Sequence, residues 1–117
     1  MDSARSMLVA VAVIAGLAEM AMAVQFALDG EAGSEPAPAA AFAAAFLLLA
    51  WFVRSGALWP VIALIVLFAV ELAFMPVYTR ESWVDWAEQG GFAAISVIGL
   101  IAGIAAVASR KRAVAPV

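Results

Sequence analysis

The sequence contains no cysteine and no histidine. Without cysteine, the chain can form no disulfide, thiolate nucleophile, iron–sulfur cluster or Cys-type zinc site. Without histidine, it lacks the commonest metal ligand and the usual general base near neutral pH. These absences exclude most familiar enzyme chemistry. We therefore expect no catalytic residues, no metal site, no cofactor and no enzymatic activity.

Charge is also scarce, because only 13% of the residues are charged while 68% are hydrophobic and the mean hydropathy is +1.09. A soluble domain would be about a quarter charged and roughly half apolar. The six Lys and Arg residues and the net charge of −3 argue against nucleic acid, whose phosphates need a basic surface. The composition predicts an integral membrane protein whose main partner is the lipid bilayer.

Long apolar segments determine the predicted fold. A transmembrane helix needs about 20 predominantly apolar residues, and backbone groups in lipid must find their hydrogen-bond partners within such a helix. The predicted spans cover residues 7–28, 37–53, 57–78 and 91–109. The sequence thus predicts one domain over residues 1–117, an all-α polytopic membrane protein folded as an antiparallel bundle of four transmembrane helices.

The distribution of bases predicts the orientation. Arg5, Arg54 and the cluster at 110–112 supply five of the six Lys and Arg residues, at the two ends of the chain and in the second connection. The other two connections are acidic and contain only Arg80. Because bases in short flanks stay on the cytoplasmic side, we expect both termini in the cytoplasm of a bacterial-type plasma membrane.

The first span also permits a second interpretation. Arg5, the apolar stretch after it and Ala21-Met22-Ala23 are typical of a signal peptide with an A-x-A cleavage site, which would remove residues 1–23. The apolar segment continues past that site to Leu28, which favours a retained span. The mass of the intact protein would distinguish the two alternatives.

The second acidic connection contains two tryptophans. Trp83 and Trp86 lie on one face of the segment 82–89, which predicts a short interfacial helix lying flat at the outer surface, joined to the last span by Gly90-Gly91. Alternatively, these tryptophans simply anchor the adjoining spans at the headgroup layer.

Glu19 and Glu71 are the only charged residues within the predicted spans. A charged Asp at the centre of a membrane helix costs about 2.5 to 3.5 kcal/mol, so such acids usually face the interior of a bundle. We expect the pair to share one proton, and Gln25 and Tyr78 are further candidates for proton or ligand binding. Alternatively, the acids are neutral and fix the packing through interhelical hydrogen bonds, with Ser96 as one partner, although such bonds average only about 0.6 kcal/mol.

Small residues predict the contacts between helices. Gly16 lies on the same face as Glu19, and Gly99 and Gly103 form a G-x-x-x-G motif with Ser96 on nearly the same face. Such a face packs either inside the bundle or against a partner chain, which would be another membrane protein or a second copy in a homo-oligomer.

The two halves of the chain resemble each other weakly. Glu19 begins Glu-Met-Ala-Met, Glu71 begins Glu-Leu-Ala-Phe, and each is followed ten residues later by another acid. This pattern predicts a parallel repeat of two helices each, unless four spans of similar length produce the parallel by chance.

The chain resembles the small multidrug-resistance transporters in its length, its four spans and the segment Gly16-Leu17-Ala18-Glu19. The chain departs from that family in its third span, in its longer outer loops and in its second buried acid. No residue role is therefore carried over from the resemblance.

Two functions follow from these observations. The first is a membrane protein without catalytic activity that acts as an accessory subunit or helix-packing partner. The alternative is a proton-coupled transporter or binding protein for a small lipophilic or cationic compound, with Glu19 and Glu71 as the exchanging acids.

Overall fold

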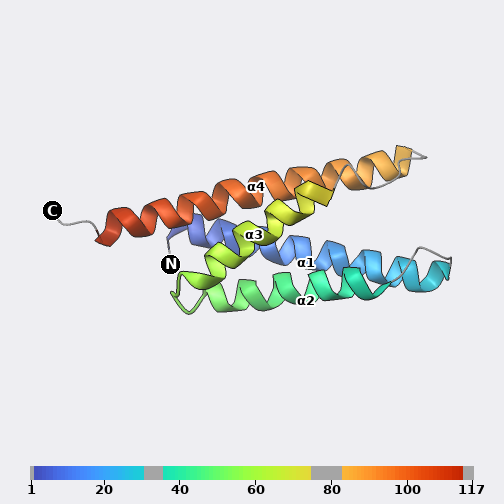
Figure 1. The fold of residues 1–117 in the computed structure, drawn as a ribbon, viewed down its shortest axis with the longest axis horizontal. Coiled ribbons are helices and arrows are strands. Elements are labelled where there is room, and N and C mark those ends of the chain that lie inside the picture. Colours follow the sequence, from blue (N-terminus) through green and yellow to red (C-terminus); the bar gives the residue numbers. More distant parts are fainter. Residues whose placement is uncertain (1, 31–35, 75–82, 115–117) are drawn as a thin grey trace.

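A computed structural model describes residues 2–30, 36–74 and 83–114, and the chain forms four helices in these ranges. This confirms the prediction of an all-helical fold with four helices. The helices are α1 (Ser3–Asp29), α2 (Pro36–Val53), α3 (Trp59–Phe74) and α4 (Trp83–Val114) (Figure 1).

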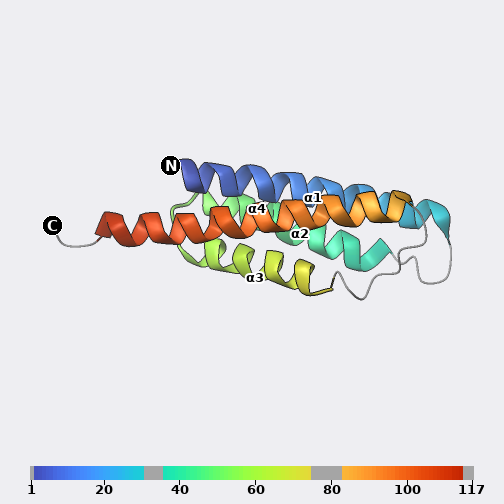
Figure 2. The same cartoon turned by 90° about the horizontal axis from the view of Figure 1, so that it is seen from above.

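The four helices form a bundle in which α1 and α3 each pack against α2 and α4. As a result, α1 and α3 occupy diagonal corners (Figure 2). The start of α1, the α2–α3 turn and the end of α4 lie together (Figure 1). We call this the basic end, because its segments contain five of the six Lys and Arg residues, and we call the opposite end the acidic end.

Three helices are long and apolar enough to cross a membrane: α1, α2 and the segment Trp86–Ser109 of α4. At 1.5 Å per residue, the 18 residues of α2 reach about 27 Å and the 27 residues of α1 reach about 40 Å. The third predicted span, residues 57–78, corresponds to α3, which has 16 residues. Residues 75–78, predicted to complete it, lie outside the described residues.

The helix ends follow from local chemistry. Asp2 precedes α1, and its carboxylate accepts a hydrogen bond of 2.8 Å from the backbone N–H of Arg5, as an N-cap residue does. Gly30 ends α1 in the left-handed conformation (φ 61°), and its N–H donates to the Phe26 carbonyl. Gly56 has φ 88° in the turn after α2, which confirms the left-handed glycine expected there.

The prediction of a separate interfacial helix over 82–89 with a glycine joint is wrong for the described residues. Residues 83–91 are the first turns of α4, which continues without a break to Val114. Each glycine costs a helix interior only about 1 kcal/mol relative to alanine. Gly90 and Gly91 are therefore accommodated within α4, and Trp83 and Trp86 are exposed near its start.

Large apolar side chains fill the half of the bundle nearer the basic end. The Phe46 and Phe68 rings, both fully buried, lie 5.0 Å apart between α2 and α3. Towards the acidic end the buried side chains of the described residues are smaller or polar: Glu19, Ala23, Ala39, Ala43, Glu71 and Ser96. The bundle therefore has an apolar half and a half with small and acidic side chains.

The G-x-x-x-G motif of α4 packs inside the bundle. A Cβ atom added to Gly99 would lie 2.5 Å from the Phe68 ring, and one added to Gly103 would lie 2.5 Å from Cγ1 of Ile65. These distances are too short for van der Waals contact. The two glycines therefore allow α3 to approach α4 closely, which is the internal alternative of the two that the sequence allowed.

We predict that Gly99→Ala destabilises the bundle, because the new methyl group would overlap the Phe68 ring. The expected loss in free energy of unfolding is about 1 to 3 kcal/mol, as for other overpacked cores. Equilibrium unfolding in detergent, followed by circular dichroism, measures this loss.

Gly90→Ala is the matched control, because a Cβ atom there meets no other atom within 4 Å. We expect this variant to gain about 0.5 to 1 kcal/mol from the higher helix propensity of alanine. Equal stability of the two variants would contradict the internal packing of the motif.

Candidate functional site

Glu19 lies on the buried face of α1. It is only 6% exposed, and Ala12, Ala15 and Ala23 share its face, at seven and four residues before it and four residues after it. Gly16 lies three residues before it on the same face, where an added Cβ atom would lie 2.7 Å from Cγ of Leu47. Glu19 therefore faces the interior at a point where α1 and α2 are in close contact.

Glu71 occupies the corresponding position on α3. It is also 6% exposed, and it follows Phe68 and Leu64 on the face that packs into the bundle. Phe68 in turn contacts Gly99 of α4, so a close contact between α3 and α4 lies one helical turn before the acid. Both acids are thus placed by the same apolar faces that hold the helices together.

The two carboxyl groups meet across the diagonal of the bundle, where the Glu19 and Glu71 side chains form a hydrogen bond. Ionised carboxylates are acceptors only, so two carboxyl groups form such a bond when one of them carries a proton. While the bond persists, the pair holds at least one proton and at most one negative charge. The structure therefore brings the two predicted acids together in a geometry that fits a shared proton.

The antiparallel register of α3 and α4 places Ser96 at the level of the pair. Gly103 lies against Ile65 and Gly99 lies against Phe68, so a step of three residues forward on α3 corresponds to four residues back on α4. The same step leads from Phe68 to Glu71 and from Gly99 to Ile95, the neighbour of Ser96. Ser96 is 1% exposed, so its hydroxyl belongs to the same buried layer as the two acids.

The other two predicted site residues do not join this pair in the described structure. Gln25 is exposed, because six residues after Glu19 the helix has turned by about 240° away from the face that carries the acid. Gln25 therefore lies on a different face of α1 from Glu19, and its role in proton or ligand binding stays a prediction. Tyr78 lies outside the described residues.

Arg5 marks the predicted orientation, and in the structure it has a second role. Arg5 is 8% exposed, and its guanidinium group donates to the carbonyl oxygens of Val53 (3.0 Å) and Ala57 (2.6 Å). Val53 is the last residue of α2, where free carbonyls and the helix dipole favour a positive charge. The sequence contained one indication of this role, because Arg5 is a base at the start of α1, where the end of an antiparallel neighbour is expected.

The described residues contain no group of three or more acidic side chains that could hold a metal ion. The candidate site consists of the carboxyl pair and the buried hydroxyl of Ser96. Comparison with protein-family models, with curated proteins and with solved structures gave no match.

We predict that Arg5→Gln weakens the junction between α1 and the α2–α3 turn. The shorter amide cannot reach both carbonyl oxygens, and hydrogen bonds to charged groups contribute about 1.5 to 3 kcal/mol. The expected decrease in free energy of unfolding is of that size, and equilibrium unfolding in detergent measures it.

Arg54→Gln removes the same charge from the same end of the bundle and serves as the control. Arg54 is exposed and lies 4.9 Å from the centre of the Trp51 ring, a contact worth about 0.5 to 1 kcal/mol at an exposed site. A larger loss for Arg54→Gln than for Arg5→Gln would contradict the role given to Arg5.

Proposed function

We propose that this chain is a multi-pass protein of the plasma membrane, without catalytic activity, that exchanges a proton at Glu19 and Glu71 for a small lipophilic cation. The observation that carries the proposal is the hydrogen bond between the two buried carboxyl groups. Buried ionisable groups in membrane helices are costly and commonly mark proton or substrate pathways.

The outer surface of the bundle supports a location in the membrane. Large apolar side chains are exposed on all four helices, for example Leu17, Leu48, Val66 and Ile101, each between 55% and 63% exposed. A helix that is apolar on all sides is suited to lipid rather than to water. Exposed tryptophans occur near both ends of the bundle, where a headgroup layer would meet them: Trp51, Trp59, Trp83 and Trp86.

The charge distribution supports an orientation in which the basic end faces the cytoplasm. The start of α1, the α2–α3 turn and the end of α4 share this end (Figure 1), and their segments contain five bases and one acid, Asp2. The acidic end includes Asp29 and Glu88. Because bases are retained on the cytoplasmic side, both ends of the chain would lie in the cytoplasm.

The chemistry of the pair favours exchange with a cation. Loss of the shared proton leaves two negative charges in an interior that solvates them poorly, and a cation restores the previous net charge of the site. An apolar body on that cation would suit the buried alanine side chains on the acidic side of the pair. Proton release and cation binding would then be two states of one site.

The packing of the bundle favours access from the acidic end. On that side of the pair, the buried residues of α1 and α2 are the alanines Ala23, Ala39 and Ala43. On the other side, Phe46 and Phe68 fill the interior. Small side chains obstruct a path less than aromatic rings do, so the pair would exchange with the outer side more easily.

An accessory subunit was the first interpretation of the sequence, and a helix face free to bind a partner would support it. Gly99 and Gly103 lie against Phe68 and Ile65 within the bundle, so this small-residue face is already occupied. The motif thus gives no support to a partner chain, whereas the carboxyl pair supports exchange.

We predict that binding of a lipophilic cation releases protons from the purified protein. Tetraphenylphosphonium is added to the full-length protein in weakly buffered detergent solution, and a pH-sensitive dye reports release of up to one proton per chain. Glu19→Gln and Glu71→Gln each replace the shared proton by an amide that donates but does not titrate. In each variant we expect the proton release to decrease at least about tenfold. A loss of about 1.4 kcal/mol of interaction corresponds to a tenfold change in an equilibrium constant.

Asp29→Asn is the matched control, because Asp29 is an exposed acid on the same helix as Glu19. This variant should release protons as the unmodified chain does. Absence of release from the unmodified chain, or undiminished release from both Gln variants, would refute the proposal. Circular dichroism of each variant verifies that the helices are retained.

A further inference from the structure

Arg5 and Glu19 lie on the same buried face of α1. Ala12 is seven residues from each of them and is fully buried, so the three side chains follow one line along the helix. At 1.5 Å per residue, this line is about 21 Å long. The inner face of α1 therefore leads from a buried base at the basic end to the buried carboxyl pair.

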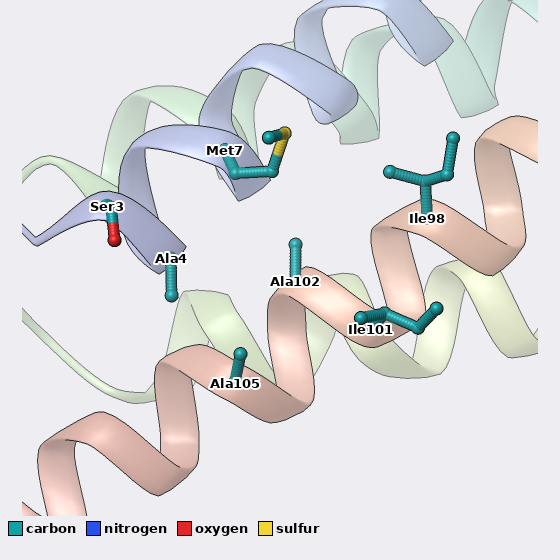
Figure 3. Close-up of a pocket in the computed structure, with 7 residues that line it drawn as sticks. All are labelled: Ser3, Ala4, Met7, Ile98, Ile101, Ala102 and Ala105. Carbon is teal, nitrogen blue, oxygen red and sulfur yellow. The ribbon is translucent and has the colours of Figure 1, made fainter.

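The guanidinium group of Arg5 points to the α2–α3 turn. Its Nη2 atom donates to the carbonyl oxygens of both Val53 and Ala57, and the residue is 8% exposed. Neighbouring side chains of α1 take another direction, because Ala4 and Met7 border an open groove towards α4 that no charged residue lines (Figure 3). The charge of Arg5 thus lies inside the bundle and not in the groove.

The positive charge of Arg5 has no negative partner nearby. Among the side chains that the structure describes, no carboxylate pairs with the guanidinium group, which contacts two neutral carbonyl groups instead. Asp2, the nearest acid in the chain, accepts a hydrogen bond from the backbone N–H of Arg5. Carbonyl oxygens carry only partial charges, and an arginine side chain in a protein stays protonated. A net positive charge therefore lies at the basic end of the interior.

Packed apolar side chains separate Arg5 from the carboxyl pair. They come from α1, α2 and α3, belong to one core and are at most 1% exposed: Leu8, Phe46, Val53, Val61, Leu64 and Phe68. Such an interior screens charges poorly, so a fixed charge acts strongly within it. Pores use a fixed arginine in this way to exclude protons and cations. A cation that approaches the pair from the basic end would meet Arg5 first.

We propose that Arg5 is a gate against cations at the basic end of the bundle. Its positive charge, held in place by Val53 and Ala57, keeps protons and cations from moving between the carboxyl pair and the basic side. This inference rests on the proposed exchange at Glu19 and Glu71, and it adds that the described conformation exchanges with the acidic side only. Exchange with the basic side requires Arg5 to separate from the two carbonyl oxygens.

A single introduced thiol tests the gate, because the chain has no cysteine of its own. Ala12→Cys places this thiol on the line between Arg5 and Glu19. The full-length protein is reconstituted in liposomes, and an N-terminal tag that added protease removes identifies the chains whose basic end faces outside. Two membrane-impermeant reagents of opposite charge are then added, trimethylammonium-ethyl and sulfonato-ethyl methanethiosulfonate. Mass spectrometry measures how fast each reagent modifies these chains, relative to its rate with a free thiol.

In the chain that retains Arg5, we expect the cationic reagent to react more slowly than the anionic one. Arg5→Gln removes the charge and should raise the ratio of the cationic to the anionic rate at least about tenfold. Arg5→Lys keeps the charge and should keep the low ratio. Loosened packing without a change of charge would admit both reagents and leave the ratio as it was.

Arg54→Gln is the matched control, because it removes a base from the same end of the bundle, where Arg54 is exposed. Its ratio should equal that of the chain with Arg5 and Arg54 intact. An unchanged ratio in Arg5→Gln would overturn the proposal, and so would exclusion of both reagents from that variant. An equal rise in Arg54→Gln would overturn it as well.

Passive proton flux into liposomes provides a measurement that does not need the introduced thiol. An enclosed pH-sensitive dye should report a flux at least about tenfold faster for Arg5→Gln than for the unmodified chain, and Arg5→Lys should show the slow flux. Equal flux through Arg5→Gln and the unmodified chain would overturn the gate. Neither measurement uses a lipophilic cation, so failure of the gate is distinguishable from failure of proton release by the carboxyl pair.

Discussion

The hydrogen bond between Glu19 and Glu71 is the constraint on which the arrangement of the bundle depends. It joins α1 and α3, which occupy diagonal corners and pack mainly through α2 and α4. Side chains from opposite corners can meet only where the residues between them are small. Ala43 of α2 and Gly99 of α4 meet this condition near the level of the pair. The contact between the two acids therefore depends on the small residues beside them.

The same bond fixes how α1 and α3 are rotated about their axes. Burial of a carboxyl group without a partner costs far more than burial of an apolar side chain, so each acid must point to the other rather than to lipid. Once both acids point inward, Ala15 and Phe68 are also directed to the core by helical periodicity. In a helix that is apolar on all sides, the hydrophobic pattern does not indicate which face points into the bundle. The buried acids therefore indicate the rotation of α1 and α3 better than the hydrophobic pattern does.

The sequence was sufficient to predict four helices, the burial of both acids and the close packing at Gly16, Gly99 and Gly103. These features depend on residue type and on helical spacing, which a single chain displays. The continuity of α4 through Gly90 and Gly91 was not predicted, because two adjacent glycines are typical of a flexible joint. In the structure, the 32-residue helix accommodates both at a cost of about 1 kcal/mol each. The hydrogen bonds of Arg5 could not be predicted, because the carbonyl oxygens that accept them lie far along the chain. Gln25 is exposed, because six residues after Glu19 the helix has turned by about 240°.

The structure also bears on the weak repeat between the two halves of the chain. Each half is an antiparallel pair of helices, and in each the acid follows a close interhelical contact by three residues: Gly16 with Leu47 precedes Glu19, and Phe68 with Gly99 precedes Glu71. The small residue belongs to the first helix in one half and to the second helix in the other. The shared property is therefore the position of the contact and not the residue that makes it. Geometry of this kind places two acids at equal depth on opposite sides of a bundle, where one proton can serve both.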